Sequence, residues 1–199
     1  MARNQLLNIT IWTALLAPVV YIGVMIVRIQ NGEWDLLGPE PGRAVTQFLG
    51  TWALNSLLLT LTLSPLKRSP LSINLISYRR RMGLFAFTYM LLHLLAYMTM
   101  MLGWQWQDLN DEVVKRPYMV VGVFALLLTI PLAITSTRNW QRRLGRRWKK
   151  LHYSVYLVAA LSMVHILLQV RSSWTEFVVY SSVLSLLLIE RLLNRQKTA

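Results

Sequence analysis

Long apolar stretches alternate with short polar segments along this chain of 199 residues. A helix that crosses the hydrocarbon core of a bilayer needs about 20 predominantly apolar residues. Six stretches have this character, of which the last is the shortest: roughly 9–27, 44–66, 82–102, 118–137, 151–170 and 174–190. The pattern predicts an all-α integral membrane protein, built as a bundle of six transmembrane helices that forms a single domain over residues 1–199.

The charged residues lie mainly in the polar segments, and their distribution predicts how the helices are oriented. With six spans, the N-terminus, the 67–81 loop, the 138–150 loop and the C-terminal tail share one side and carry 16 of the 21 Lys and Arg residues. Seven of the eight acidic residues lie on the other side. The positive-inside rule then places the basic side and both termini in the cytoplasm. Topology therefore explains the net charge of +13, and no nucleic acid partner is predicted.

Cysteine is absent from the chain, which excludes several kinds of redox centre. There are no thiolate ligands for an iron–sulfur cluster and no C-x-x-C-H motif for covalent haem attachment. The sequence also lacks the Gly-rich loop of a dinucleotide-binding domain. If the protein moves electrons, the donor and the acceptor are other molecules, and any haem is bound non-covalently.

Two histidines are predicted at similar depth in the membrane. His93 lies eleven residues into the third predicted helix and His165 lies fourteen residues into the fifth. These helices run in the same direction, so the difference in depth is about 4 Å, less than one helical turn. A porphyrin between the helices would receive one imidazole from each side, and its six-coordinate iron would transfer electrons. The alternatives are histidines that hydrogen-bond neighbouring helices, or a zinc site, for which four ligands would be needed.

The third histidine, His152, lies thirteen residues before His165 and about 20 Å lower by helix rise, at the cytoplasmic end of the fifth predicted helix. It is either part of an inner site for a second cofactor or an interfacial histidine beside a basic loop. The first role of the basic runs nearby is to keep their loops on the cytoplasmic side, where they meet anionic lipid. Arg also binds carboxylates and phosphates bidentately. The candidates for pairing with haem propionates or a flavin phosphate are Arg79, Arg80 and Arg147.

Short motifs at the ends of the predicted helices point to a family. They are Ser64-Pro65-Leu66, Arg80-Arg81-x-Gly83, Arg116-Pro117-Tyr118, Thr135-Ser136-Thr137 and the most specific run, Leu144-Gly145-Arg146-Arg147-Trp148-x-x-Leu151-His152. With His93 and His165, these motifs resemble the ferric-reductase-like transmembrane superfamily over about residues 44–170. Within it, the chain is similar to the MsrQ (YedZ) family of haem-binding membrane subunits, which serve the periplasmic protein-methionine-sulfoxide reductase system.

The resemblance implies a multi-pass haem b protein of the bacterial inner membrane, with one haem or two and with His93, His165 and His152 as iron ligands. It implies that electrons come from the quinone pool or a flavin reductase and pass to a periplasmic molybdenum-cofactor subunit, which reduces methionine sulfoxide. The family is also associated with FMN. Two-haem relatives carry an inner histidine on the third helix, where this chain has Arg79. The inner site would then hold a haem with an unusual ligand, or flavin or quinone.

Three other functions fit some of these features. A ferric reductase of the same fold would differ only in its electron acceptor. A small transporter would use the histidines as a proton or metal relay, but such proteins commonly place Asp or Glu inside the membrane. Here Glu190 lies only at the end of a predicted span. A haem-free scaffold that anchors a periplasmic enzyme would leave the matched depth of the histidines unexplained.

Overall fold

The computed structural model describes residues 2–68, 75–169 and 174–196, and these residues form helices and short connections without a β-strand. The helices are α1 (Ala2–Gln30), α2 (Pro41–Arg68), α3 (Arg79–Ala96), α4 (Leu109–Lys115), α5 (Pro117–Ile134), α6 (Arg138–Leu144), α7 (Arg146–His152), α8 (Val155–Gln169) and α9 (Thr175–Gln196). α3 continues as a π-helix over Tyr97–Met101. Short 3-10 helices cover Trp34–Leu37, Leu75–Tyr78 and Trp106–Asp108. The predicted all-α class is confirmed.

Among the described residues, five helical segments are long and apolar enough to cross a membrane. They are Gln5–Gln30, Pro41–Leu66, Arg79–Met101, Pro117–Ile134 and Arg146–Gln169. Each contains or overlaps one of the first five predicted stretches, and the protein is therefore a multi-pass membrane protein. The sixth predicted stretch, 174–190, forms most of α9, and its passage through the membrane stays a prediction.

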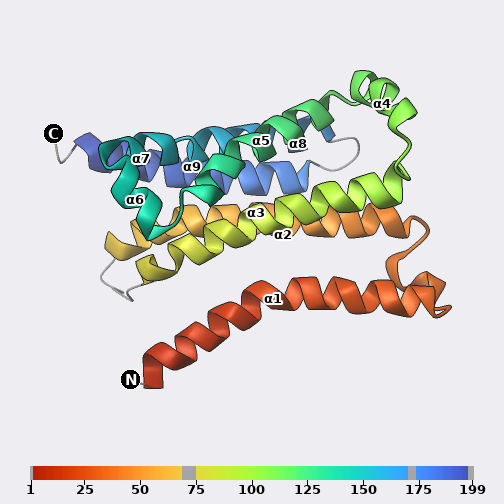
Figure 1. The fold of residues 1–199 in the computed structure, drawn as a ribbon, viewed down its shortest axis with the longest axis horizontal. Helices are drawn as coiled ribbons and strands as arrows, with labels where there is room; N and C mark the ends of the chain where they lie inside the picture. The colour runs from red at the N-terminus through yellow and green to blue at the C-terminus, as the bar shows by residue number, and fades with distance from the viewer. Residues whose placement is uncertain (1, 69–74, 170–173, 197–199) are drawn as a thin grey trace.

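The long helices lie side by side in one bundle (Figure 1). The closest helix pairs are α2 with α3 and α5 with α8, and α9 packs against both α2 and α8. The two ends of the chain lie at the same end of the bundle as α6, whereas α4 lies at the opposite end (Figure 1). Both pairs, α2–α3 and α5–α8, are therefore hairpins whose connections lie at the end that carries the termini.

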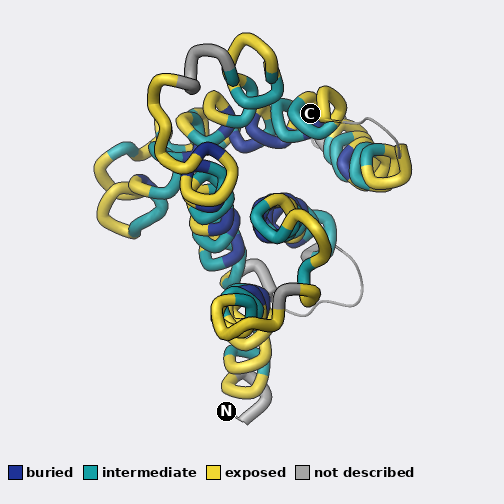
Figure 2. The backbone as a smooth tube through the Cα atoms, turned by 90° about the vertical axis from the view of Figure 1, so that its right-hand side faces the viewer, coloured by how far each residue is buried: buried dark blue, intermediate teal, exposed yellow. Residues whose placement is uncertain are grey.

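Burial is concentrated where the helices face one another, and the outward faces are exposed (Figure 2). The largest apolar cluster joins α2, α3, α5, α8 and α9 through the buried residues Leu54, Leu57, Leu58, Leu61, Ala86, Ala125, Val155, Val158, Ala159, Met163 and Leu184. Many large apolar side chains remain exposed on the outer faces, among them Phe124, Leu157 and Leu186. An exposed apolar surface of this extent is expected where lipid tails, and not water, surround the bundle.

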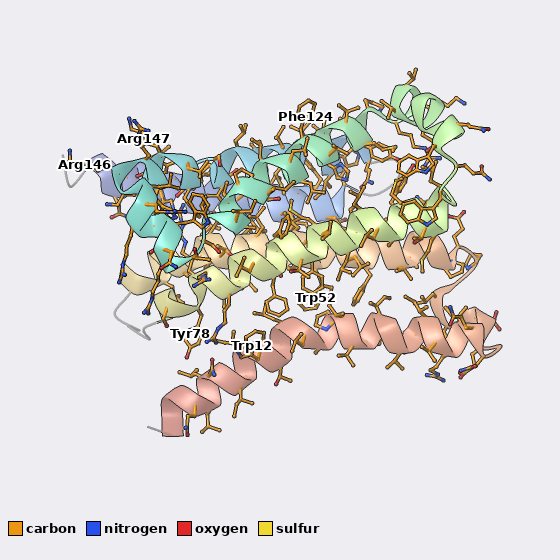
Figure 3. All side chains as sticks on the ribbon, in the orientation of Figure 1. Trp12, Trp52, Tyr78, Phe124, Arg146 and Arg147 are labelled. Atoms are coloured by element: carbon orange, nitrogen blue, oxygen red, sulfur yellow. The ribbon has the colours of Figure 1, made fainter. Side chains whose placement is uncertain are left out.

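The N-terminal helix α1 packs against α2 and α3 through aromatic side chains. Figure 3 shows Trp12 and Trp52 between α1 and these helices. Trp12 meets Phe85 edge to face with ring centroids 5.7 Å apart. The Tyr89 side chain is fully buried, and its hydroxyl donates a hydrogen bond of 2.6 Å to the carbonyl of Leu15 on α1. This bond ties α1 to the helix that carries His93.

Tyr89→Phe is expected to weaken the attachment of α1. It removes one buried hydrogen bond and keeps the ring, so the free energy of unfolding should fall by about 0.6–1.5 kcal/mol. Unfolding in mixed detergent, followed by circular dichroism, measures this loss. Tyr21→Phe is the matched control on α1, because the Tyr21 side chain is about half exposed, at 49%. A loss in the control equal to that in Tyr89→Phe would contradict the assignment.

Candidate haem site

His93 is held on α3 by the backbone of the neighbouring helix α2. Its Nδ1 atom lies 2.8 Å from the carbonyl oxygen of Thr46. A carbonyl only accepts hydrogen bonds, so Nδ1 carries the proton and donates it. The lone pair of the neutral ring is then on Nε2, which is free to bind a metal ion. A backbone acceptor on Nδ1 is the arrangement that fixes the tautomer and orientation of metal-binding histidines.

His165 on α8 is held in the same way by α5. Its Nδ1 atom lies 2.6 Å from the carbonyl oxygen of Tyr118. The aromatic ring of Tyr118 also meets the His165 ring edge to face, with centroids 5.7 Å apart. His165, like His93, therefore presents Nε2 as the free nitrogen.

The rings of His93 and His165 lie at the distance that a shared metal ion requires. Their centroids are 6.2 Å apart and their planes are inclined at 82°. A metal–imidazole bond is about 2 Å long, and the centre of the ring lies about 1.2 Å from its nitrogen, given ring bonds of about 1.3–1.4 Å. Two imidazoles on opposite sides of one metal ion therefore have centroids about 6.3 Å apart. The observed separation fits one iron atom between the two rings.

The described residues supply no third acidic, cysteine or histidine ligand beside this pair. No group of three or more of these residues capable of holding a metal ion exists within the part of the chain that the structure describes. Zinc needs four protein or water ligands, whereas a porphyrin supplies four nitrogens of its own and needs only axial ligands from the protein. The two histidines therefore fit the axial positions of a haem.

Two glycines make room for the imidazoles. A Cβ atom on Gly50 of α2 would lie 2.9 Å from Nδ1 and 3.1 Å from Cε1 of His93. A Cβ atom on Gly122 of α5 would lie 2.9 Å from both Nδ1 and Cε1 of His165. Nonbonded carbon and nitrogen atoms do not approach so closely without a shift of one of them. Each histidine is therefore packed directly on the backbone of the neighbouring helix, at a position where only glycine fits.

The two halves of the site are related by a constant offset in the sequence. Thr46, Gly50 and His93 each have a counterpart 72 positions later, namely Tyr118, Gly122 and His165. The α2–α3 hairpin and the α5–α8 hairpin thus contribute the same three elements, a carbonyl acceptor, a glycine and a histidine. Sequence reasoning missed these supporting residues. The one trace of this arrangement in the sequence is a glycine 43 positions before each of the two histidines.

His152 lies away from this pair, at the end of α7, in different surroundings. The hydroxyl of Thr135 donates to the carbonyl of Pro131 at 2.6 Å, so its oxygen accepts the bond of 3.1 Å from Nε2 of His152. The indole of Trp148 stacks on the His152 ring at 4.0 Å, and its Nε1–H donates to the Thr135 carbonyl at 2.9 Å. In this arrangement Nδ1 of His152 is the free nitrogen, whereas in His93 and His165 it is Nε2. Iron ligation by His152 stays a prediction.

The structure places the three candidate arginines at the end of the bundle that carries the termini. Arg79 is half-buried and lies close enough to His152 for their charges to interact. Arg80 and Arg147 are exposed, and Figure 3 shows Arg147 pointing away from the bundle. Arg79 lies fourteen residues before His93, which is about 21 Å along the helix. The pairing of these arginines with haem propionates or a flavin phosphate stays a prediction.

Comparison with known proteins identifies the family of this chain. Residues 49–163 match the family described as the ferric reductase like transmembrane component. The chain is 40% identical over 175 residues to the protein-methionine-sulfoxide reductase heme-binding subunit MsrQ of Xanthomonas euvesicatoria pv. vesicatoria. The aligned residues make up 88% of this chain and 80% of that protein. The MsrQ subunit of Xanthomonas axonopodis pv. citri is 39% identical over 190 residues, with 94% and 87% covered. No solved structure matches the chain. The chain thus belongs to the MsrQ family of heme-binding subunits, within the ferric-reductase-like transmembrane proteins.

Proposed function

We propose that this protein is the haem b electron-transfer subunit of a methionine-sulfoxide reductase system in the bacterial inner membrane. It takes electrons from the quinone pool or a flavin donor and delivers them to a periplasmic, molybdenum-dependent partner. The reduction of methionine sulfoxide belongs to that partner. The observation that carries the proposal is the pair of imidazoles 6.2 Å apart, each anchored through Nδ1. The relatives' name, a heme-binding subunit of protein-methionine-sulfoxide reductase, supports the assignment of the acceptor.

The residues around the pair suit electron transfer better than oxygen chemistry. Haem b, when bound, supplies one-electron redox chemistry at its iron. His93 and His165 would hold the haem iron through their Nε2 atoms, one from each hairpin, and the haem would supply electron transfer. The carbonyls of Thr46 and Tyr118 hold the two rings in place and make their Nε2 atoms more basic. The fixed rings keep the ligand geometry unchanged when the charge of the site changes, which lowers the reorganisation needed for each transfer.

The proposed topology gives the two ends of the bundle different roles. Six crossings, with α9 as the last, place both termini, α6 and α7 in the cytoplasm. The end that carries α4 then faces the periplasm and the partner. The His93–His165 pair lies on the periplasmic side of His152, as a path from an inner donor to an outer acceptor requires.

His152 and its surroundings form the proposed electron-entry site on the cytoplasmic side. Arg79, Arg80 and Arg147 supply positive charge at this end, and the Trp148 indole offers a flat face beside the histidine. Such a site suits a planar, anionic or quinonoid ligand, with FMN, a quinone or a second haem as the candidates.

Electron delivery can be tested with the purified full-length chain. The dithionite-reduced protein should show b-type absorbance with at least one haem per chain. In the absence of oxygen, it should be reoxidised when the periplasmic molybdenum enzyme and methionine sulfoxide are added together, and not with either alone. The match to the ferric-reductase-like family supports one alternative function, that of a ferric reductase. Rapid reoxidation by ferric chelates, with none by the molybdenum enzyme, would replace the proposal with that function.

A further inference from the structure

A cluster of polar side chains lies at the end of the bundle where α3 ends and α5 begins. We call it the outer cluster, and it consists of Tyr97, Glu112, Arg116 and Tyr118. The Tyr97 hydroxyl donates to Oε2 of Glu112 at 2.7 Å. The same Oε2 atom lies 2.8 Å from Nε of Arg116. Nη1 of Arg116 donates to the Tyr118 hydroxyl at 3.4 Å. The cluster therefore connects α3, α4 and α5.

The outer cluster borders both histidines of the candidate haem site. Tyr97 follows His93 by four residues, about 6 Å along the helix axis. Tyr118 supplies the carbonyl that holds His165, and its ring contacts the His165 ring. The helix also changes at this level, because the π-helix of α3 begins at Tyr97. Single π-helical turns are frequent at functional sites.

A haem carries two propionate carboxylates, and a carboxylate in a membrane protein needs a positively charged or hydrogen-bonding partner. Toward the cytoplasmic end, apolar residues such as Leu54, Ala86 and Val158 form the buried cluster. The polar side chains buried on that side among the described residues are neutral hydroxyls, among them those of Ser56, Thr60 and Thr129. The arginines of that end are about 20 Å away along the helix. The hydrogen bonds of Arg116 lead through Glu112 to Tyr97, about one helical turn beyond His93, and directly to Tyr118, whose ring contacts His165.

The guanidinium of Arg116 has the donors for this role. Arginine carries five N–H groups in a rigid fork that matches a carboxylate. Glu112 and Tyr118 engage two of its nitrogens, and further N–H groups remain. The Arg116 side chain is 34% exposed and the Glu112 side chain 22%, so the ion pair is partly shielded from solvent. Glu112 and Tyr118 thus fix the position of the guanidinium without using all its donors.

We propose that Arg116 binds a propionate carboxylate of the haem, and that Glu112, Tyr97 and Tyr118 position the guanidinium of Arg116. This proposal rests on the proposed haem site. The haem then lies with its propionate edge toward the α4 end of the bundle. The sequence analysis instead named Arg79, Arg80 and Arg147 as candidates for pairing with haem propionates or a flavin phosphate.

The propionate contact can be tested by comparing haem with its dimethyl ester, in which both carboxylates are blocked. Full-length protein from haem-deficient cells is placed in nanodiscs and titrated with each compound. Arg116→Gln should bind haem about ten- to hundredfold more weakly than the wild type, as expected for loss of a charge-assisted hydrogen bond. The wild type should lose a similar factor when the ester replaces haem. Arg116→Gln should then bind the ester as well as the wild type does.

Two variants control for effects on folding. Arg116→Lys keeps the charge and should recover part of the haem affinity. Arg28→Gln removes an arginine that pairs with Glu33 on the exposed end of α1, and it should bind haem like the wild type. Equal losses of haem and ester affinity in Arg116→Gln, or no loss of either, would overturn the propionate assignment. The proposed function would fail separately, through a wild type that binds no haem.

Discussion

His93→Ala and His165→Ala are each expected to abolish most of the b-type absorbance of the dithionite-reduced protein. Each substitution removes one of the two proposed ligands of the haem iron. Loss of a residue that merely supports a metal ligand typically costs 10–100-fold in affinity, and loss of the ligand itself costs more. Haem per chain, measured as the pyridine complex, and the absorption spectrum of the purified protein give the result.

The matched control for this experiment is His152→Ala. It removes a histidine that precedes α8, but its ring is engaged by Thr135 and Trp148 and lies about 20 Å from the pair. The absorbance that depends on His93 and His165 should remain in His152→Ala.

Added imidazole should restore haem binding to His93→Ala, because the free base fits the space that the ring has left. Full haem content in either His93→Ala or His165→Ala, with normal membrane insertion, would refute the assignment of the ligands.

The apolar pattern was sufficient to predict the five long helices that suit a membrane span, but not the short helices α4, α6 and α7. A segment of about 20 apolar residues that crosses a membrane forms a helix, because each backbone N–H and C=O group must find its hydrogen-bond partner within the segment. His93 and His165 could be compared in depth from helix rise alone. The structure brings their rings to 6.2 Å, as the prediction of a shared haem requires.

The residues that support the histidines could not be predicted in the same way. The acceptors for Nδ1 are main-chain carbonyls, and a carbonyl is present at every residue, so Thr46 and Tyr118 carry no side-chain signal for this role. Gly50 and Gly122 are also ambiguous, because small residues pack at helix interfaces throughout membrane proteins. Which face of α2 meets α3 depends on the packing of the whole bundle. The arginine of the outer cluster, Arg116, was visible only as part of a family motif.

Gly50→Ala and Gly122→Ala are expected to reduce haem affinity by about ten- to hundredfold, the range for changes that displace a metal ligand without removing it. The new Cβ atom at residue 50 would lie 2.9 Å from Nδ1 of His93, so the ring must move off its carbonyl acceptor. Movement of the ring also moves Nε2 away from the iron position. Haem titration of the apoprotein measures the loss, and the constant offset of 72 positions predicts a similar loss for both variants.

Gly83→Ala on α3 is the control for the glycine variants. A Cβ atom there would lie 3.6 Å from Cγ2 of Thr60, an ordinary van der Waals contact. Alanine is also favoured over glycine in a helix by about 1 kcal/mol. This variant should keep its haem and be at least as stable as the wild type. Wild-type haem affinity in both Gly50→Ala and Gly122→Ala would show that the close packing of the rings on the glycines is not needed.

A double-mutant cycle separates the contact from a general effect on helix packing. In the apoprotein, Gly50→Ala should lower the free energy of unfolding when His93 is present, because the Cβ atom and the ring compete for the same space. In a His93→Ala background the ring is absent, so the same substitution should have no cost and should show the usual gain of alanine over glycine. The two effects are therefore coupled, as expected for residues in direct contact. If Gly50→Ala lowered the free energy of unfolding equally in both backgrounds, the new Cβ atom would clash with a neighbour other than the His93 ring.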